Sequence, residues 1–116
     1  MAKKPEYNYK SLQTEYGKMP PQAVDLEEAI LGSLMLEKDA FITVSDFLKP
    51  ECFYKEAHQK IYRGIQNLSL NNEPVDILTV SEEMKRLGEL EEIGGYYYLA
   101  QLTSKVASAA HIEFHA

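Results

Sequence analysis

Cysteine, tryptophan and long hydrophobic runs are almost absent from this sequence. Its 116 residues include one cysteine and no tryptophan. A single cysteine excludes an internal disulfide and is typical of a reducing compartment, and we expect Cys52 to be a small buried hydrophobe. No apolar run reaches the ~20 residues that a membrane-spanning helix needs, and residues 1–7 lack the apolar core of a secretion signal. These absences predict a cytoplasmic domain without membrane contact that depends on an ordinary hydrophobic core.

The glycines do not form a phosphate-binding loop, which follows the pattern Gly-x-x-x-x-Gly-Lys-Ser/Thr. The six glycines, at positions 17, 32, 64, 88, 94 and 95, do not have this spacing. The pair Gly94-Gly95 precedes a predicted helix whose N-terminus could hold an anion, but Glu91 and Glu92 lie just before it and would repel a phosphate. A tight turn is therefore the favoured interpretation of the glycine pair.

Metal-binding and catalytic patterns are incomplete. His111 and His115 have the spacing of zinc ligands on one helix face, but Ile112 occupies the place of the metalloprotease glutamate and no third ligand follows. The glutamate doublets fall on helix starts or surfaces, not across a cleft from one another. His58 lies on or beside an apolar stripe, has no serine or cysteine nucleophile in a matching pattern, and is expected to be hydrogen-bonded and partly buried. We therefore predict no catalytic residue, cofactor or metal in this chain.

Charge divides the chain into two parts. Residues 1–19 contain four lysines and two glutamates, whereas residues 20–116 contain eight basic and sixteen acidic residues. Sequence-independent affinity for nucleic acid comes from lysine and arginine, so the acidic part is not expected to bind DNA directly. A protein partner is the expected ligand. Residues 1–19 show no sustained hydrophobic periodicity and are predicted to be a disordered tail. The tail ends at the pair Pro20-Pro21, which stops a helix from extending backwards.

Residues 20–116 are predicted to form one all-α domain, a compact irregular bundle of five or six short helices. The first helix starts at Asp25 in a pattern similar to a capping box, and Gly32 in its middle predicts the close approach of another helix. The second starts at Asp39, and the third, residues 55–70, has the strongest helical period and is expected to be central. The buried positions expected on these helices are Leu26, Ile30, Leu31, Leu34, Met35, Phe41, Val44, Phe47, Leu48, Ala57, His58, Ile61, Ile65 and Leu68.

Three further helices are predicted. Asp76 is expected to cap the fourth, which ends at Gly88 after two basic residues, a combination typical of a helix C-terminus. The fifth begins at the glycine pair. A sixth, residues 109–116, is expected to be capped by Ser108 and stops in mid-pattern, which indicates a piece of a longer protein. The buried positions expected on the fourth and fifth helices are Ile77, Val80, Ser81, Met84, Leu87, Leu99, Leu102 and Val106.

The fifth helix carries three consecutive tyrosines. Because successive residues rotate by about 100°, Tyr96 and Tyr98 flank its apolar stripe on opposite sides, while Tyr97 points away from it. This turn is therefore interpreted as a joint between the core and a partner.

Six short motifs follow one another along residues 20–116. They are PPQ at 20–22, EAILGSLM at 28–35, FYKEAHQKIY at 53–62, EPVDILTV at 73–80, GELEEIGGYYYL at 88–99 and SAAHIE at 108–113. The ordered set resembles the N-terminal domain of the bacterial replicative DNA helicase, the DnaB family. Ala23 and His111 replace residues that are more often serine and asparagine in that family, which would shift the helix starts slightly.

The resemblance implies a bacterial, cytoplasmic ring helicase that is a homohexamer. Its C-terminal motor, which uses ATP and Mg²⁺ and moves on single-stranded DNA, would lie outside this chain, as would the helical hairpin that precedes the motor. Its N-terminal domains pair into a collar that binds the helicase-binding domain of primase, with a helicase loader as a further candidate partner. The fragment itself would then be non-catalytic.

The resemblance also implies roles for particular residues. Tyr96 matches a bulky residue used in pairing of the domains, and Tyr97 is grouped with it as a candidate dimer contact. Asp25 and Tyr98 match positions on the primase-facing side. Two structural alternatives stay open, since Asp25 would also cap its helix and Tyr98 would also close the edge of the core.

Two other function classes remain as alternatives. A stand-alone acidic helical adaptor or inhibitor would share the bundle, but it would be expected to end at a proper helix cap. An enzyme with an unrecognised helical site would show measurable ATP turnover, against the absence of a phosphate-binding loop.

Overall fold

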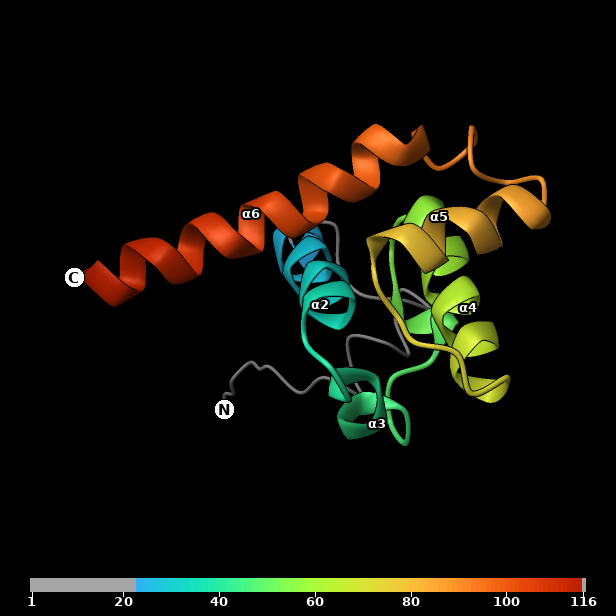
Figure 1. Ribbon diagram of the computed structural model, residues 1–116, viewed down its shortest axis with the longest axis horizontal. Coiled ribbons are helices and arrows are strands. Elements are labelled where there is room, and N and C mark those ends of the chain that lie inside the picture. The colour runs from blue at the N-terminus through green and yellow to red at the C-terminus, as the bar shows by residue number, and fades with distance from the viewer. Residues whose placement is uncertain (1–22, 116) are drawn as a thin grey trace, which may run out of the picture.

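The computed structural model describes residues 23–115, and the regular secondary structure in that range is all helical, which confirms the all-α prediction. The helices are α2 (Val24–Leu36), α3 (Ala40–Val44), α4 (Glu56–Leu70), α5 (Ile77–Arg86) and α6 (Gly95–His115), with a short 3₁₀ helix, η2 (Pro50–Cys52), before α4. The predicted disordered tail and the proline boundary lie outside the described residues. In Figure 1, α6 runs along one side of the molecule from near α5 to beyond α2, and α3 lies at the opposite side.

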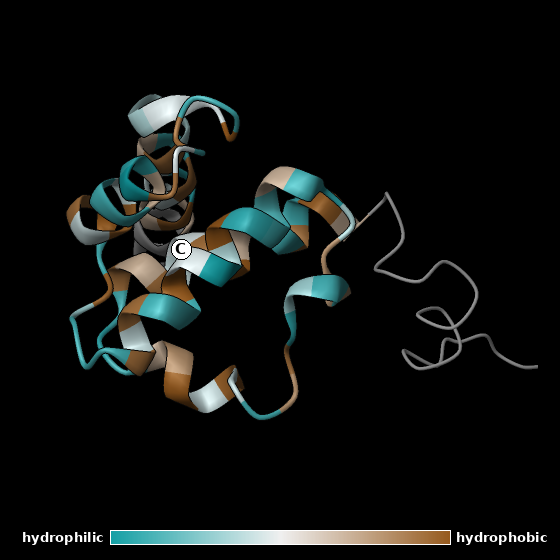
Figure 2. Cartoon of the chain, turned by 90° about the vertical axis from the view of Figure 1, so that its right-hand side faces the viewer, coloured by the Kyte–Doolittle hydropathy of each residue, from teal (hydrophilic) through white to brown (hydrophobic). Residues whose placement is uncertain are grey.

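The core is built where α2, α4, α5 and α6 face one another. Its fully buried side chains include Phe53, Ile61 and Tyr62, and Tyr62 donates a hydrogen bond of 2.6 Å to the Leu48 carbonyl oxygen. Figure 2 shows hydrophobic and hydrophilic residues interleaved along the helices, as expected where each helix buries one face. Cys52 is buried, as predicted. The buried hydrophobic residues are Leu31, Leu34, Met35, Leu48, Cys52, Phe53, Ile61, Tyr62, Ile65, Leu68, Val80, Met84, Ile93, Leu99 and Leu102.

Gly32 marks the closest approach between α2 and α6, as its position in mid-helix predicts. A β-carbon at position 32 would lie 2.7 Å from Val106 Cγ2 and closer still to the carbonyl oxygen of Leu102. Because the obstacle includes the backbone of α6, only glycine allows the two helices to cross at this distance. The crossing fixes α6 on α2.

Two helix ends follow the predicted signals. Asp76 accepts a 2.8 Å hydrogen bond from the backbone N–H of Thr79, whose hydroxyl accepts one from the backbone N–H of Asp76, so a complete capping box starts α5. The helix ends before Gly88, which has a left-handed φ of 75°. Leu87, expected in the core, is instead partly exposed at the C-cap.

The start of α2 corrects one prediction. The helix begins at Val24 with Ala23 at the N-cap, where an alanine side chain has no acceptor to offer. Asp25 therefore lies within the first turn and not at the cap position. Leu26, expected in the core, is 52% exposed, because the buried face of α2 passes through Glu27, Leu31, Leu34 and Met35 and places position 26 at its side.

Predictions for α3 and α6 also need correction. Asp39 precedes α3 as expected, but it has a left-handed φ of 68° and makes no capping hydrogen bond. The helix ends at Val44, so the helical phase that would bury Phe47 is lost, and that ring is 67% exposed. No separate helix starts at Ser108, since α6 is continuous to His115. Polar groups such as the Thr103 hydroxyl bond back to a carbonyl one turn earlier and are accommodated within the helix.

Candidate functional site

A buried polar network joins α2, α4 and α6. Glu27 on α2 and His58 on α4 are both fully inaccessible to solvent, and the Glu27 Oε1 atom lies 2.7 Å from His58 Nδ1. The other imidazole nitrogen, His58 Nε2, lies 2.6 Å from the hydroxyl oxygen of Tyr98 on α6. The planes of these two rings are within 10° of each other. The histidine is therefore satisfied on both nitrogens, as predicted, although it is more deeply buried than expected.

Glu27 also holds the start of α4. Its Oε2 atom accepts a 2.6 Å hydrogen bond from the backbone N–H of Tyr54, and its Oε1 atom accepts a longer one, 3.4 Å, from Lys55 at the N-cap position. A carboxylate at this position interacts favourably with the positive end of the helix dipole. Three N–H donors around one buried carboxylate compensate the loss of water that burial of a charge requires.

Burial decides the protonation state of this network. Burial lowers the pKa of His58, while the hydrogen bond to Glu27 opposes the decrease. Burial likewise raises the pKa of Tyr98 to about 12, and the nearby Glu28 carboxylate adds to the rise. Both shifts favour a neutral imidazole at His58 and a neutral phenol at Tyr98 at neutral pH.

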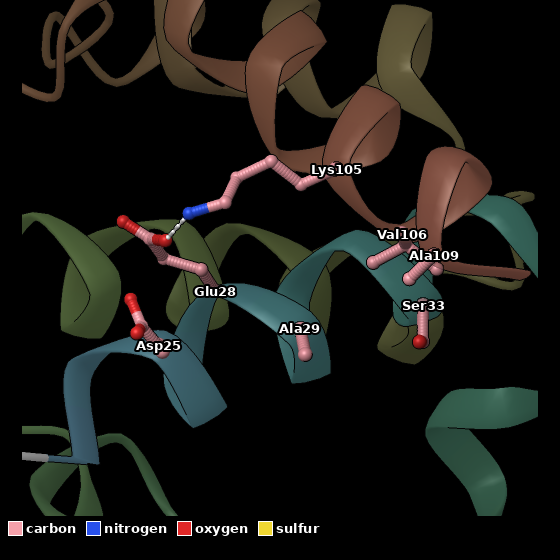
Figure 3. Close-up of a pocket in the computed structure, with 7 residues that line it drawn as sticks. All are labelled: Asp25, Glu28, Ala29, Ser33, Lys105, Val106 and Ala109. Atoms are coloured by element: carbon pink, nitrogen blue, oxygen red, sulfur yellow. Dashed lines mark hydrogen bonds and ion pairs between the residues drawn. The ribbon is translucent and has the colours of Figure 1, made fainter. Parts of the chain in front are cut away.

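A groove lies beside this network, between α2 and α6. It has a volume of about 450 Å³ and is shown in Figure 3. Lys105 of α6 reaches over it and forms an ion pair with Glu28 of α2, which raises the pKa of the lysine. Asp25 stands at the N-terminal end of the groove, next to Glu28 in the same figure. The residues that line it are Asp25, Glu28, Ala29, Ser33, Lys105, Val106 and Ala109.

Glu28 connects the groove with the buried network. A second hollow, of about 380 Å³, is lined by Glu28, Tyr98 and Lys105 among others. Glu28 thus borders Asp25 on one side and Tyr98 on the other. The structure therefore brings the two primase-facing candidates, Asp25 and Tyr98, to the same region of the α2–α6 surface.

The two other candidate residues lie at the start of α6. Tyr96 is 50% exposed and Tyr97 is 73% exposed, while Tyr98 is partly buried against the core. This order matches the prediction from helical rotation that Tyr97 points away from the core. Gln101 Nε2 donates a 3.5 Å hydrogen bond to the Tyr97 hydroxyl, which is the contact expected one turn along a helix.

Three participating residues were not predicted from the sequence. Glu27 was expected, as part of a glutamate doublet, at a helix start or on the surface, whereas it is buried, and Glu28 and Lys105 were not assigned a joint role. A signal for Glu27 was present, since it lies on the same helix face as Leu31 and Leu34. No pattern in the sequence indicated the pairing of Glu28 with Lys105, which is 77 residues away.

Metal sites and membrane spans were searched for in the described part of the chain. Residues 23–109, whose side chains are described, contain no group of three or more His, Cys, Asp or Glu residues able to hold a metal ion. The side chains of His111 and His115 lie outside the described residues. Among the described helices, none has both the length and the apolar character needed to cross a membrane.

Comparison with known proteins gives a consistent family. Residues 19–116 match the family described as DnaB-like helicase N terminal domain. A replicative DNA helicase DnaB of Rhodothermus marinus is 48% identical over 106 residues, which make up 91% of this chain and 11% of that protein. The corresponding helicase of Geobacillus stearothermophilus is 41% identical over 99 residues, 85% of this chain and 22% of that protein. The chain therefore spans between about a tenth and about a fifth of the length of these relatives.

A solved structure agrees with the sequence relatives. The crystal structure of the N-terminal domain of DnaB helicase from Mycobacterium tuberculosis matches with a TM-score of 0.70 and 43% sequence identity, over 74% of this chain and 60% of that one. Both the predicted resemblance and the predicted fold are thereby confirmed. The chain belongs to the family of DnaB-like helicase N-terminal domains.

Proposed function

We propose that this chain is the non-catalytic collar module of a replicative DNA helicase, which pairs with further copies of itself and binds primase during bacterial DNA replication. DNA unwinding and ATP hydrolysis with Mg²⁺ are assigned to the larger part of such helicases, beyond the region matched here. A helicase loader is a further candidate partner, and the cytoplasm is the corresponding location.

The observation that carries the proposal is the α2–α6 surface. It presents Asp25, the Glu28–Lys105 pair and the edge of Tyr98 together, on a rigid helix crossing. Charged groups around a partly apolar groove suit recognition of a folded protein partner, because the charges set orientation and the apolar floor is available for burial. The acidic composition of residues 20–116 disfavours DNA as the direct ligand.

Self-association is assigned to the first turn of the same helix. Tyr96 and Tyr97 present two exposed aromatic rings in successive positions, and tyrosine is enriched in protein–protein interfaces. Since α6 carries Tyr98 directly after them, the pairing contact and the primase contact would lie on adjacent faces of one helix turn.

Sedimentation of the chain with and without the primase C-terminal domain tests both assignments. We expect Asp25→Lys combined with Tyr98→Ala to reduce primase binding at least tenfold, and Tyr96→Ala combined with Tyr97→Ala to reduce self-association. Asp46→Lys makes the same charge change as Asp25→Lys on an exposed residue near α3. Phe47→Ala removes an exposed ring there, and neither control is expected to change binding.

The outcome is decisive if circular dichroism shows that every variant is folded. Unchanged primase affinity in the folded Asp25→Lys, Tyr98→Ala variant would refute the assignment of that surface. An equal loss in the Asp46→Lys control would show that net charge, and not the groove, governs binding.

A further inference from the structure

The buried network and the groove form one continuous line of polar groups. It runs from Glu27 through His58 and Tyr98 to Glu28, and ends at Lys105 on the surface. Its members alternate between helices, with Glu27 and Glu28 on α2, His58 on α4, and Tyr98 and Lys105 on α6. A change in protonation or hydrogen bonding at the buried Glu27–His58 pair can therefore be transmitted through these contacts to Lys105 on the surface.

The hydrogen-bond directions in this line follow from the chemistry of each group. The Glu27 carboxylate can only accept, so His58 Nδ1 must carry the proton in their 2.7 Å hydrogen bond. In a neutral imidazole Nε2 is then an acceptor, and the Tyr98 hydroxyl must donate to it across 2.6 Å. The neutral state thus has one defined tautomer, in which the Tyr98 hydroxyl donates to His58 while the Glu28 carboxylate also lies within hydrogen-bonding reach of that hydroxyl.

We propose that His58 selects the hydrogen-bond partner of the Tyr98 hydroxyl, and that protonation of His58 redirects this hydroxyl from His58 to Glu28. Protonated His58 donates from both nitrogens, so Tyr98 can only accept from it and its own proton needs another acceptor. Glu28 is the carboxylate that shares a hollow with Tyr98. Once Glu28 accepts from Tyr98, its ion pair with Lys105 weakens.

The charges around His58 support this role of His58 as a selector of the Tyr98 hydrogen-bond partner. Glu27 and Glu28 face it from α2, and both favour the protonated form. Lys55, immediately before α4, opposes that form, and its ammonium group lies 5.6 Å from the centre of the Tyr98 ring. From α6 the group that faces His58 is the Tyr98 hydroxyl. The apolar ring of Phe53 packs edge-on against the His58 imidazole. Burial disfavours the charge while the carboxylates favour it, so opposing contributions set the protonation state of His58.

The first test is the tautomer of neutral His58. Replacing His111 and His115 by glutamine leaves His58 as the single histidine, so its ring nitrogens can be assigned directly by long-range ¹H–¹⁵N NMR. We expect a protonated, pyrrole-type Nδ1 and an unprotonated, pyridine-type Nε2 near neutral pH. The opposite tautomer, or two protonated nitrogens at about pH 8, would overturn the proposal.

The second test is coupling between His58 and the surface. During acidification we expect the Lys105 side-chain resonance to shift with the same midpoint as His58. That transition should disappear in Tyr98→Phe and persist in Tyr97→Phe, which removes the neighbouring exposed hydroxyl. Lys60, which pairs with Glu92 elsewhere on the surface, is the internal control and should not follow His58.

Two results would refute the coupling. One is a Lys105 transition that survives Tyr98→Phe, and the other is unfolding of the domain before His58 takes up a proton. Neither experiment contains primase or depends on self-association. Failure of the selector can therefore be distinguished from failure of the proposed function.

Discussion

Replacing Gly32 by alanine tests the α2–α6 crossing directly. Alanine in mid-helix is favoured over glycine by about 1 kcal/mol, but overpacking a tight contact costs about 1–3 kcal/mol. The β-carbon would meet both Val106 and the Leu102 carbonyl, and the backbone of α6 cannot move aside without shifting the whole helix. We therefore place the cost near its upper limit and expect a net loss of about 1–2 kcal/mol in the free energy of unfolding.

Gly64→Ala is the matched control for this experiment. Gly64 is also a buried glycine in mid-helix, but its added β-carbon would meet the sulfur of Met84 at 2.8 Å, and that side chain is flexible. Gly64→Ala should therefore change stability by less than about 1 kcal/mol. Urea denaturation followed by circular dichroism measures both, and Gly32→Ala should also lower the Tm by about 5–15 °C. Equal or higher stability of Gly32→Ala would refute the argument that α6 backbone limits this contact.

Three further predictions concern stability. Asp76→Ala removes the cap of α5 and should cost about 1 kcal/mol in urea denaturation, whereas Asp46→Ala on the surface should cost less than about 0.5 kcal/mol. Tyr62→Phe leaves the buried Leu48 carbonyl without its donor and should cost about 1–2 kcal/mol; an unchanged midpoint would contradict this. Burial lowers the pKa of His58 from 6.5, so as the pH falls this histidine takes up a proton in the unfolded chain before it does so in the folded domain. The free energy of unfolding should therefore decrease below about pH 6.5, by up to about 1.4 kcal/mol for each unit by which the pKa of His58 differs between the folded and unfolded states. His58→Gln should flatten that dependence, and an equally steep profile in this variant would exclude His58 as the cause.

Local signals in the sequence predicted the elements that depend on neighbouring residues. The cap at Asp76 needs only a carboxylate and a threonine three positions later, and the end of α5 needs only basic residues and Gly88. The close approach of another helix to Gly32 was predicted for a similar reason, because a glycine in mid-helix carries a cost that close packing offsets, and the structure identifies that helix as α6. Helical rotation alone accounts for Tyr97 being the most exposed of the three tyrosines of α6.

The remaining features depend on contacts between distant segments. Glu27 is charged, and its burial becomes favourable only because the start of α4 and His58, 31 residues away, supply its donors. Phe47 is hydrophobic, yet it is exposed because α3 ends earlier than its pattern indicates. The groove likewise depends on where α6 crosses α2. None of these outcomes is visible in a window of neighbouring residues.

Because α6 packs on α2 at Gly32, the part of α6 beyond Leu102 is a rigid helical arm that is held at the crossing. From Leu102 to His115 the helix continues for roughly 20 Å at about 1.5 Å per residue, and in Figure 1 this arm projects past the rest of the domain. A tilt of about 10° at the crossing would displace the far end by roughly 3–4 Å. Small readjustments beside Tyr98 would thus be magnified at whatever adjoins the end of the arm.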